Sequence, residues 1–253
     1  MNSIWETSFK IRSTDVDAFN RMKVSVVLDY FQDAASNDAE RLHFGFSDFV
    51  SKGLIWVLSW AKFEFIDYPK FSDQIKIQTW PKKQYKLYSI RDYLMMDSAN
   101  RVICKGTSAW ILLDSKSFRP KILTQLFPDS KMLFSKDALT ELPQKINIPS
   151  RTENIYSTQV RYSEIDLNQH TNNVRYVDMM LNCFDLDFHH NNVINTLTVS
   201  FNSETKFSDT IELRREKIST NPSSFYVDAV KSGNDKPVFQ SMIEWKPINL
   251  TKI

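Results

Sequence analysis

The sequence predicts an α+β protein built from two tandem units, each a long helix wrapped by an antiparallel β-sheet. One long amphipathic helix pattern is followed by a series of strand-like runs, and the same order recurs in the second half of the chain. The 18 Phe, 9 Tyr and 6 Trp residues supply the large apolar side chains that sheets favour. A chain of 253 residues is long enough for two modest domains with proper cores.

The first unit is read from its hydrophobic periodicity. Alternation from Trp5 to Ser13 predicts a strand, and apolar residues spaced by three or four, ending near Gly45, predict a helix at about residues 23–43. Turn signals then separate four runs that are rich in β-branched and aromatic residues. These predicted strands are residues 54–65, 74–80, 85–96 and 102–113.

The second half of the chain repeats the first. Residues 160–166 (VRYSEID) resemble residues 11–17 (IRSTDVD) at an offset of 149, and residues 206–209 (KFSD) repeat residues 70–73 at an offset of 136. The smaller offset predicts a shorter second copy, which we assign to a loop. A proline-containing stretch between the copies predicts an extended connector. The predicted domains are therefore residues 1–118, a connector at 119–150, and residues 151–253.

Composition excludes several functional classes. The N-terminus has no basic segment followed by an apolar run, and no apolar stretch reaches membrane-spanning length, so we expect a soluble, cytoplasmic protein with no membrane partner. Cys104 and Cys183 lack metal-ligand spacing and are expected to be reduced thiols, with no metal site. A net charge of +2 argues against a nucleic-acid partner.

The densest cluster of chemically active residue types lies at residues 166–176 (DLNQHTNNVRY). If residues 166–170 are extended, Asp166, Asn168 and His170 share one face. A helix pattern begins at Val174, and its N-terminus would favour the negative charge of a polarised carbonyl oxygen, with an Asn amide as second donor. The alternative is that the Asp and Asn residues only form a turn and cap the helix.

This run closely resembles the D-x-N-x-H-x-N-N-x-x-Y motif of acyl-acyl carrier protein thioesterases. Residues 54–59 (LIWVLS) look like that family's LIWV segment, and Tyr68-Pro69 looks like its YP turn. The resemblance covers nearly the whole chain. It implies a double hotdog fold and hydrolysis of acyl-acyl carrier protein thioesters to free fatty acid and carrier thiol. It implies no cofactor, an acyl carrier protein carrying a fatty acyl chain as partner, and it leaves a homodimer open.

The resemblance also implies a set of catalytic residues. Glu204 matches a family carboxylate, but Thr205 stands where plant members carry Cys, so a thiolate nucleophile cannot operate there. Water attack remains. Glu204 and Asp166 are assigned to hold and deprotonate the water, with the division between them open. Asn168 would polarise the thioester carbonyl, and His170 would orient water or protonate the leaving thiolate. Without the resemblance, Glu204 reads as a strand residue paired with a nearby cation.

Comparison of the copies predicts a single active site. Phe19, Arg21 and Tyr68 stand opposite Asn168, His170 and Glu204, and only Asp17 matches its counterpart. The first unit is therefore expected to shape an acyl-chain cavity. Its predicted lining residues are Val27, Phe31, Trp56, Leu58 and Trp60. Two basic groups are candidates for meeting an acidic carrier: Lys82, Lys83, Lys86 and Arg91, and separately Lys116, Arg119 and Lys121.

Three other functions stay open on the sequence. An acyl-CoA thioesterase would use the same residues on a different thiol, and a hotdog dehydratase would act on a 3-hydroxyacyl chain without releasing thiol. A non-catalytic acyl-thioester-binding hotdog protein would use the polar cluster only for recognition. The presence of Asn168, His170 and Glu204 together favours hydrolysis, because a binding protein needs no base.

Overall fold

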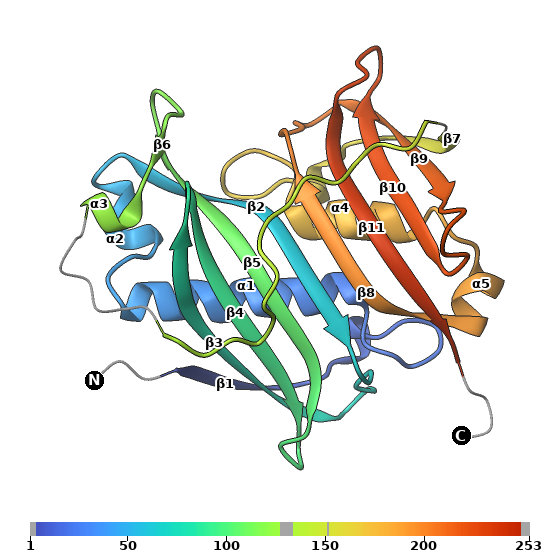
Figure 1. Ribbon diagram of the computed structural model, residues 1–253, viewed down its shortest axis with the longest axis horizontal. Coiled ribbons are helices and arrows are strands. Elements are labelled where there is room, and N and C mark those ends of the chain that lie inside the picture. Colours follow the sequence, from blue (N-terminus) through green and yellow to red (C-terminus); the bar gives the residue numbers. More distant parts are fainter. Residues whose placement is uncertain (1–3, 127–133, 151, 249–253) are drawn as a thin grey trace. The chain divides into compact units, whose positions relative to one another are not determined.

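The computed structural model describes residues 4–126, 134–150 and 152–248 (Figure 1). Its contacts divide the chain into two units, Met1–Pro143 and Gln144–Ile253. The division falls inside the stretch predicted as a connector, residues 119–150, so that stretch is shared between the units. Residues 127–133 of the predicted connector lie outside the described residues.

The first unit is a five-stranded antiparallel sheet covered on one face by a helix (Figure 1). The strands follow the order β1-β3-β4-β5-β2, and a short β6 pairs with β5. The elements are β1 (Trp5–Lys10), α1 (Val24–Arg41), α2 (Phe46–Val50), β2 (Leu54–Phe65), β3 (Gln74–Tyr85), β4 (Tyr88–Asp97), β5 (Val102–Asp114), β6 (Pro120–Lys121) and α3 (Leu123–Leu126), with a 3-10 turn at Ser13–Asp15.

The second unit has the same strand order, β7-β9-β10-β11-β8, and again a helix packs on one face. Its elements are β7 (Glu153–Gln159), α4 (Asn173–Leu181), α5 (Leu186–Asn191), β8 (Asn192–Phe201), β9 (Thr210–Lys217), β10 (Ser224–Lys231) and β11 (Pro237–Pro247), with a 3-10 turn at Tyr162–Glu164. The predicted α+β class with a repeated helix-and-sheet unit is confirmed.

The two sequence offsets recur in individual backbone hydrogen bonds. The amide of Met22 donates to the carbonyl of Pro69 at 2.8 Å, and the amide of Thr171 donates to the carbonyl of Thr205 at 2.9 Å. The donors differ by 149 residues in number and the acceptors by 136, the same offsets that the sequence repeat shows. The repeat therefore includes the backbone bonds between individual loops, and positions in the two copies can be compared residue by residue.

The shortening of the second copy is not only the loop difference that the sequence predicted. Helix α1 has 18 residues, whereas α4 has only 9. Phe184, at helical spacing from Leu181, lies beyond the end of α4 in a cluster of aromatic rings. Its ring centroid is 5.0 Å from that of Phe188 and 4.9 Å from that of Trp245. These rings, and Asp185 capping α5 through the amide of Phe188, favour a new helix over continuation of α4.

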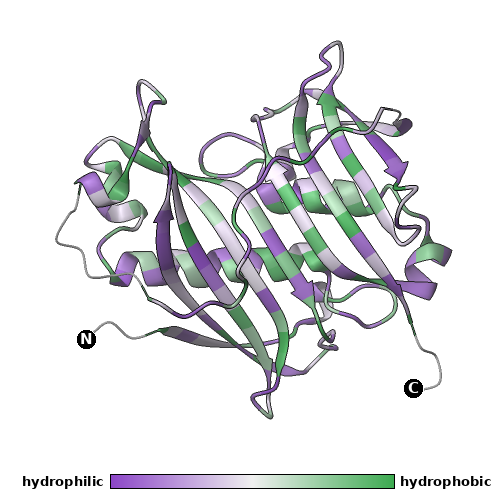
Figure 2. Cartoon of the chain, in the orientation of Figure 1, coloured by the Kyte–Doolittle hydropathy of each residue, from purple (hydrophilic) through white to green (hydrophobic). Residues whose placement is uncertain are grey.

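The core of the first unit lies between α1 and the sheet. Phe31 is 1% exposed and stacks on Tyr93 of β4 with ring centroids 4.7 Å apart. A Cβ atom at Gly106 of β5 would lie 2.8 Å from the Phe31 ring, so only glycine lets the helix approach this closely. Gly106 therefore faces α1, as do the other even-numbered residues of β5 from 104 onward. Figure 2 shows the alternation of hydrophilic and hydrophobic residues along the strands.

Residues 134–143 cover the opposite face of the same sheet (Figure 1). Trp80 donates its indole N–H to the carbonyl of Lys136 at 2.8 Å, and the amide of Ala138 donates to Asp92 Oδ2 at 2.7 Å. Asp92 precedes Tyr93 in β4, so its side chain points away from α1. In the parts of the chain that the structure describes, no helix is long and apolar enough to cross a bilayer.

Candidate active site

Residues 166–171 form a tight turn, not the extended segment that the sequence predicted. Asp166 Oδ1 accepts the backbone N–H groups of Asn168 at 2.8 Å and of His170 at 3.3 Å. Gln169 has a φ of 63°, in the left-handed region, and Ile165 pairs with Thr171 across the turn. Alternation of faces therefore does not apply here, because an Asp side chain that binds backbone amides two and four residues on closes the chain into a turn.

The turn sets how each side chain is presented. Asp166 is half-buried, and one of its oxygens is occupied by the backbone. Asn168 is exposed, and its amide makes no hydrogen bond to any residue that the structure describes, which leaves it available to a ligand. Leu167 is 93% exposed. Asn172 caps α4 by accepting the N–H of Val174 at 2.9 Å.

His170 and Glu204 meet although they come from different segments. His170 Nε2 lies 3.0 Å from Glu204 Oε2, and the two side chains are 22% and 47% exposed. The amide of Thr171 donates to the carbonyl of Thr205 at 2.9 Å, so the residues that follow the pair are also bonded through the backbone. A histidine and a carboxylate at hydrogen-bonding distance, both open to solvent, are the groups needed to accept and return a proton.

Beneath this pair lies a set of three buried hydroxyl groups. Thr205 is fully buried, and its Oγ1 is 2.6 Å from Thr171 Oγ1 and 2.8 Å from the hydroxyl oxygen of Tyr176 in α4. These residues were not among those predicted for the site. A signal was present, because all three match apolar residues in the first copy. Glu204 is exposed, whereas its neighbour Thr205 is buried.

The first copy has the same turn without the histidine. Asp17 Oδ1 accepts the amides of Phe19 at 2.8 Å and Arg21 at 2.9 Å, and Asn20 has a φ of 59°. The side chain of Arg21 also donates to this carboxylate, with Nε 3.0 Å from Asp17 Oδ2. Asp at this position thus forms the turn in both copies.

The five residues predicted to line an acyl-chain cavity do not share one face. Leu58 pairs with Trp110 whereas Trp60 pairs with Ala109, because the register shifts between them. Residues 109 and 110 point to opposite faces of β5, so Leu58 faces α1 and Trp60 faces away. Trp60 packs with Ala109 under Leu142 of the covering segment. Leu58 and Trp60 therefore cannot line one space.

The other three predicted lining residues lie on the helix side. Val27 and Phe31 of α1 are 2% and 1% exposed. Trp56 is half-buried against Phe49 and donates its indole N–H to the carbonyl of Phe44 at 2.8 Å. All three occupy packed core positions next to aromatic or aliphatic neighbours.

Both cysteines are buried, free thiols. Burial raises the pKa of the Cys183 thiol to about 12 and raises that of Cys104 as well, so neither forms a thiolate near neutral pH. Among the described residues, no group of three or more His, Cys, Asp or Glu side chains is placed to hold a metal ion.

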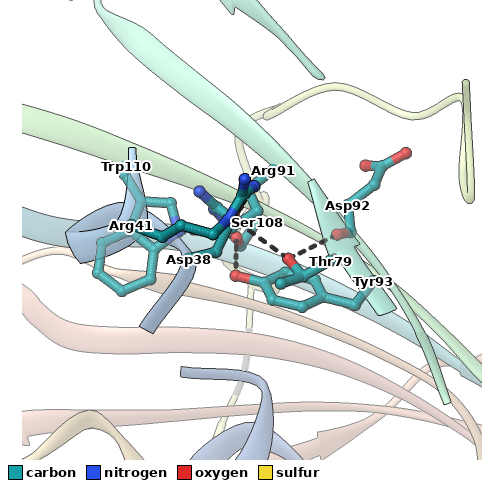
Figure 3. A network of polar contacts seen from close by, with 8 residues as sticks. All are labelled: Asp38, Arg41, Thr79, Arg91, Asp92, Tyr93, Ser108 and Trp110. Carbon is teal, nitrogen blue, oxygen red and sulfur yellow. Dashed lines mark hydrogen bonds and ion pairs between the residues drawn. The ribbon is translucent and has the colours of Figure 1, made fainter. Parts of the chain in front are cut away.

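Two of the four residues in the first predicted basic group are buried in ion pairs. Arg91 is 9% exposed, and its Nη1 lies 2.7 Å from Asp38 Oδ2 under α1 (Figure 3). Lys82 is 4% exposed and lies 3.3 Å from Asp92 and 2.6 Å from Asp137. These two cations are paired inside the first unit and do not form a surface for an acidic partner.

The second basic group is open to solvent. Lys116 and Arg119 are exposed in the turn between β5 and β6, and Lys121 is half-buried beside them. Asp114 is the carboxylate of this turn, where it accepts the amide of Lys116 at 3.1 Å. Three cations against one acid leave the turn basic.

Comparison with known proteins places both halves in one family. The sequence profile of the acyl-ACP thioesterase N-terminal domain matches residues 2–127, and that of the C-terminal domain matches residues 148–247 (ACP, acyl carrier protein). The chain is 22% identical to oleoyl-acyl carrier protein thioesterase 2 of Arabidopsis thaliana over 82% of this chain, and 23% identical to an acyl-[acyl-carrier-protein] hydrolase of Cuphea viscosissima over 96%. It spans 61% and 62% of the length of these relatives.

Solved structures show the same fold. An acyl-ACP thioesterase from Bacteroides thetaiotaomicron superposes with a TM-score of 0.83 at 23% identity, covering 96% of this chain and 98% of that one. The 12:0-ACP thioesterase from Umbellularia californica gives 0.84 at 20% identity, covering 97% and 98%. The predicted double hotdog fold is confirmed.

Proposed function

Because the chain belongs to the acyl-ACP thioesterase family, we propose that it hydrolyses acyl-ACP thioesters to a free fatty acid and the carrier thiol. One observation carries this proposal. The two copies share their turn and backbone bonds, but only the second brings a histidine within 3.0 Å of a carboxylate. The fold does not require the pair, since the first copy closes the same turn with Arg21 bound to Asp17.

Glu204 is proposed as the base. Its side chain is about half exposed and contacts His170 through one oxygen only, which leaves the other oxygen to take a proton from water. The water oxygen then bonds to the thioester carbonyl carbon, and the carbonyl oxygen gains negative charge. The amide of Asn168, which has no partner among the described residues, is proposed to donate to that oxygen.

The leaving group must receive a proton when the carbon–sulfur bond breaks. His170 is in hydrogen-bonding distance of Glu204, so the proton taken from water can return to the leaving thiolate through the imidazole. The atoms then balance as one water consumed, one fatty acid and one thiol released. These reaction steps need no acyl-enzyme intermediate, which agrees with the buried, protonated cysteines.

Asp166 is proposed to position the site and not to deprotonate water. Its Oδ1 holds the amides of Asn168 and His170, and Asp17 does the same in a copy that lacks the His–Glu pair. Of the two carboxylates that the sequence offers as the base, we therefore propose Glu204.

The carrier protein is proposed to contact the basic turn at Lys116, Arg119 and Lys121. Exposed cations attract an acidic partner at long range, and salt weakens the attraction because the screening length is about 10 Å at 0.1 M. For the acyl chain we retain Val27, Phe31, Trp56 and Leu58 as proposed contacts and omit Trp60. Cytoplasmic location, a homodimer and the absence of nucleic-acid or membrane partners stay predictions.

Free-thiol release tests the proposal. The protein is assayed with a panel of acyl-ACP and acyl-CoA thioesters of varied chain length, and fatty acid is measured in the same samples. We expect equal amounts of thiol and acid, and higher kcat/KM on the carrier-protein thioesters at low salt. Equal efficiency on both thiols would favour an acyl-CoA thioesterase. Binding of acyl-ACP without release of thiol would show a non-catalytic binding protein.

A further inference from the structure

The three buried hydroxyls below the His–Glu pair form a closed set of hydrogen bonds. Besides the two short contacts of Thr205 Oγ1, the amide of Thr205 donates to the Tyr176 hydroxyl oxygen at 3.1 Å. The hydroxyl of Thr171 donates to the carbonyl of Thr205 at 3.3 Å. Thr171 follows His170 and Thr205 follows Glu204, so the set joins the two chain segments directly beneath the pair.

The proton positions in this set follow from its two ends. A carbonyl only accepts, so the one hydroxyl proton of Thr171 is donated to the Thr205 carbonyl. The hydroxyl of Thr205 must therefore donate to Thr171 Oγ1. Tyr176 must then donate to Thr205 Oγ1. Burial raises the pKa of the Tyr176 phenol, which keeps its proton in place for this bond. Every hydroxyl donates once, and no proton is left to reach the solvent. The set therefore works as a clamp and not as a proton relay.

The first copy shows that the fold does not need this clamp. At the offsets of 149 and 136, Thr171, Tyr176 and Thr205 correspond to Met22, Val27 and Pro69, none of which carries a hydroxyl. The backbone bond between the strand-end loops is nevertheless present there, from Met22 to Pro69 at 2.8 Å. Hydroxyls and the His–Glu pair thus occur together in one copy and are absent together from the other.

We propose that Thr171, Tyr176 and Thr205 are positioning residues that hold His170 and Glu204 at hydrogen-bonding distance. The inference rests on the proposed function for its catalytic meaning. The three residues are at most 4% exposed, so they would act through the pair and not by contact with the substrate. Misplacing a catalytic group by about 1 Å can lower the rate by about 100-fold, and the clamp fixes a separation of 3.0 Å.

The test compares Thr205→Val, which removes the hydroxyl at constant shape, with Thr205→Ser, which keeps it. We expect Thr205→Val to lower kcat about 10-fold to 100-fold with KM within 3-fold, and Thr205→Ser to stay within 3-fold of the wild type. Combined with His170→Ala, Thr205→Val should cost no more than about 2-fold further, because the His170–Glu204 contact that it maintains is already lost. Ser241→Ala is the matched control, since it removes another buried hydroxyl of this unit, bonded at 2.8 Å to the Val227 carbonyl.

A purely structural role predicts different results. Full loss with both Val and Ser at position 205, additivity with His170→Ala, or an equal kcat loss in Ser241→Ala would each overturn the proposal. If Thr205→Val does not fold, Tyr176→Phe removes the clamp from the helix side and is judged by the same criteria. Crystal structures of the variants give a readout that needs no activity. A His170–Glu204 distance that stays at 3.0 Å without the hydroxyl refutes the clamp, even if the wild type hydrolyses no thioester.

Discussion

Replacing Glu204 by Gln removes the proposed base while keeping the size of the side chain. The carboxylate, one oxygen of which lies 3.0 Å from His170, becomes an amide that cannot take a proton from water. Loss of a general base lowers the rate by about 10²–10⁴-fold. At about 1.36 kcal/mol per tenfold, this raises the barrier by about 3–5 kcal/mol.

The same change should have little effect on stability. Glu204 is 47% exposed, and solvent-exposed ion pairs contribute about 0–1 kcal/mol to folding. A loss of 1 kcal/mol lowers the melting temperature of a chain of this size by about 2–4 °C. Steady-state thiol release and thermal unfolding are therefore measured on the same sample, with Glu153→Gln as the control for loss of another exposed carboxylate of this unit. Turnover of Glu204→Gln within 3-fold of the wild type would remove Glu204 from the mechanism.

Three further predictions concern other parts of the molecule. Arg21→Ala, in the copy without the pair, should leave kcat within a few-fold and lower the melting temperature, because Arg21 bonds Asp17 in its turn; a loss as large as that of Glu204→Gln would show a second active site. Because burial raises the pKa of both thiols, a Cys104→Ala, Cys183→Ala double variant should keep turnover within a few-fold, and iodoacetamide should label the native protein at pH 8 only slowly and completely after unfolding. Rapid native labelling would contradict this. Arg119→Glu should raise KM for acyl-ACP but not for acyl-CoA, and the difference should shrink with salt; an unchanged KM would move the carrier site elsewhere.

The fold was predictable because a sequence repeat with two constant offsets fixes the order of elements twice. Local patterns were less reliable where tertiary contacts compete with them. The periodicity from Val174 to Phe184 is compatible with one helix. The helix nevertheless ends at Leu181, and Phe184 packs among aromatic rings instead. The alternation at residues 166–170 suggested a strand, because sequence spacing does not show that the Asp166 side chain binds the following backbone amides.

The residues of the candidate site could be named from the sequence, but their geometry, on which the proposed roles depend, could not. His170 and Glu204 were both named as candidates. The sequence does not show that the imidazole contacts Glu204, because the two residues come from different segments. It also does not show that the Asp166 side chain binds the backbone of its own turn. The basic group was misread at Lys82 and Arg91 for a similar reason. A positive charge in a strand looks solvated until its buried carboxylate partner is located on another strand or helix.

Direct attack of water is the central claim, and a single-turnover reaction of the wild type with acyl-ACP in ¹⁸O-labelled water tests it most directly. Protein mass and product mass are recorded in quenched samples over the time course. We predict one ¹⁸O atom in each released fatty acid, one free thiol per acid, and an enzyme mass that never changes. An enzyme species heavier by the mass of the acyl group, formed and consumed at the rate of turnover, would contradict the mechanism and require a covalent intermediate.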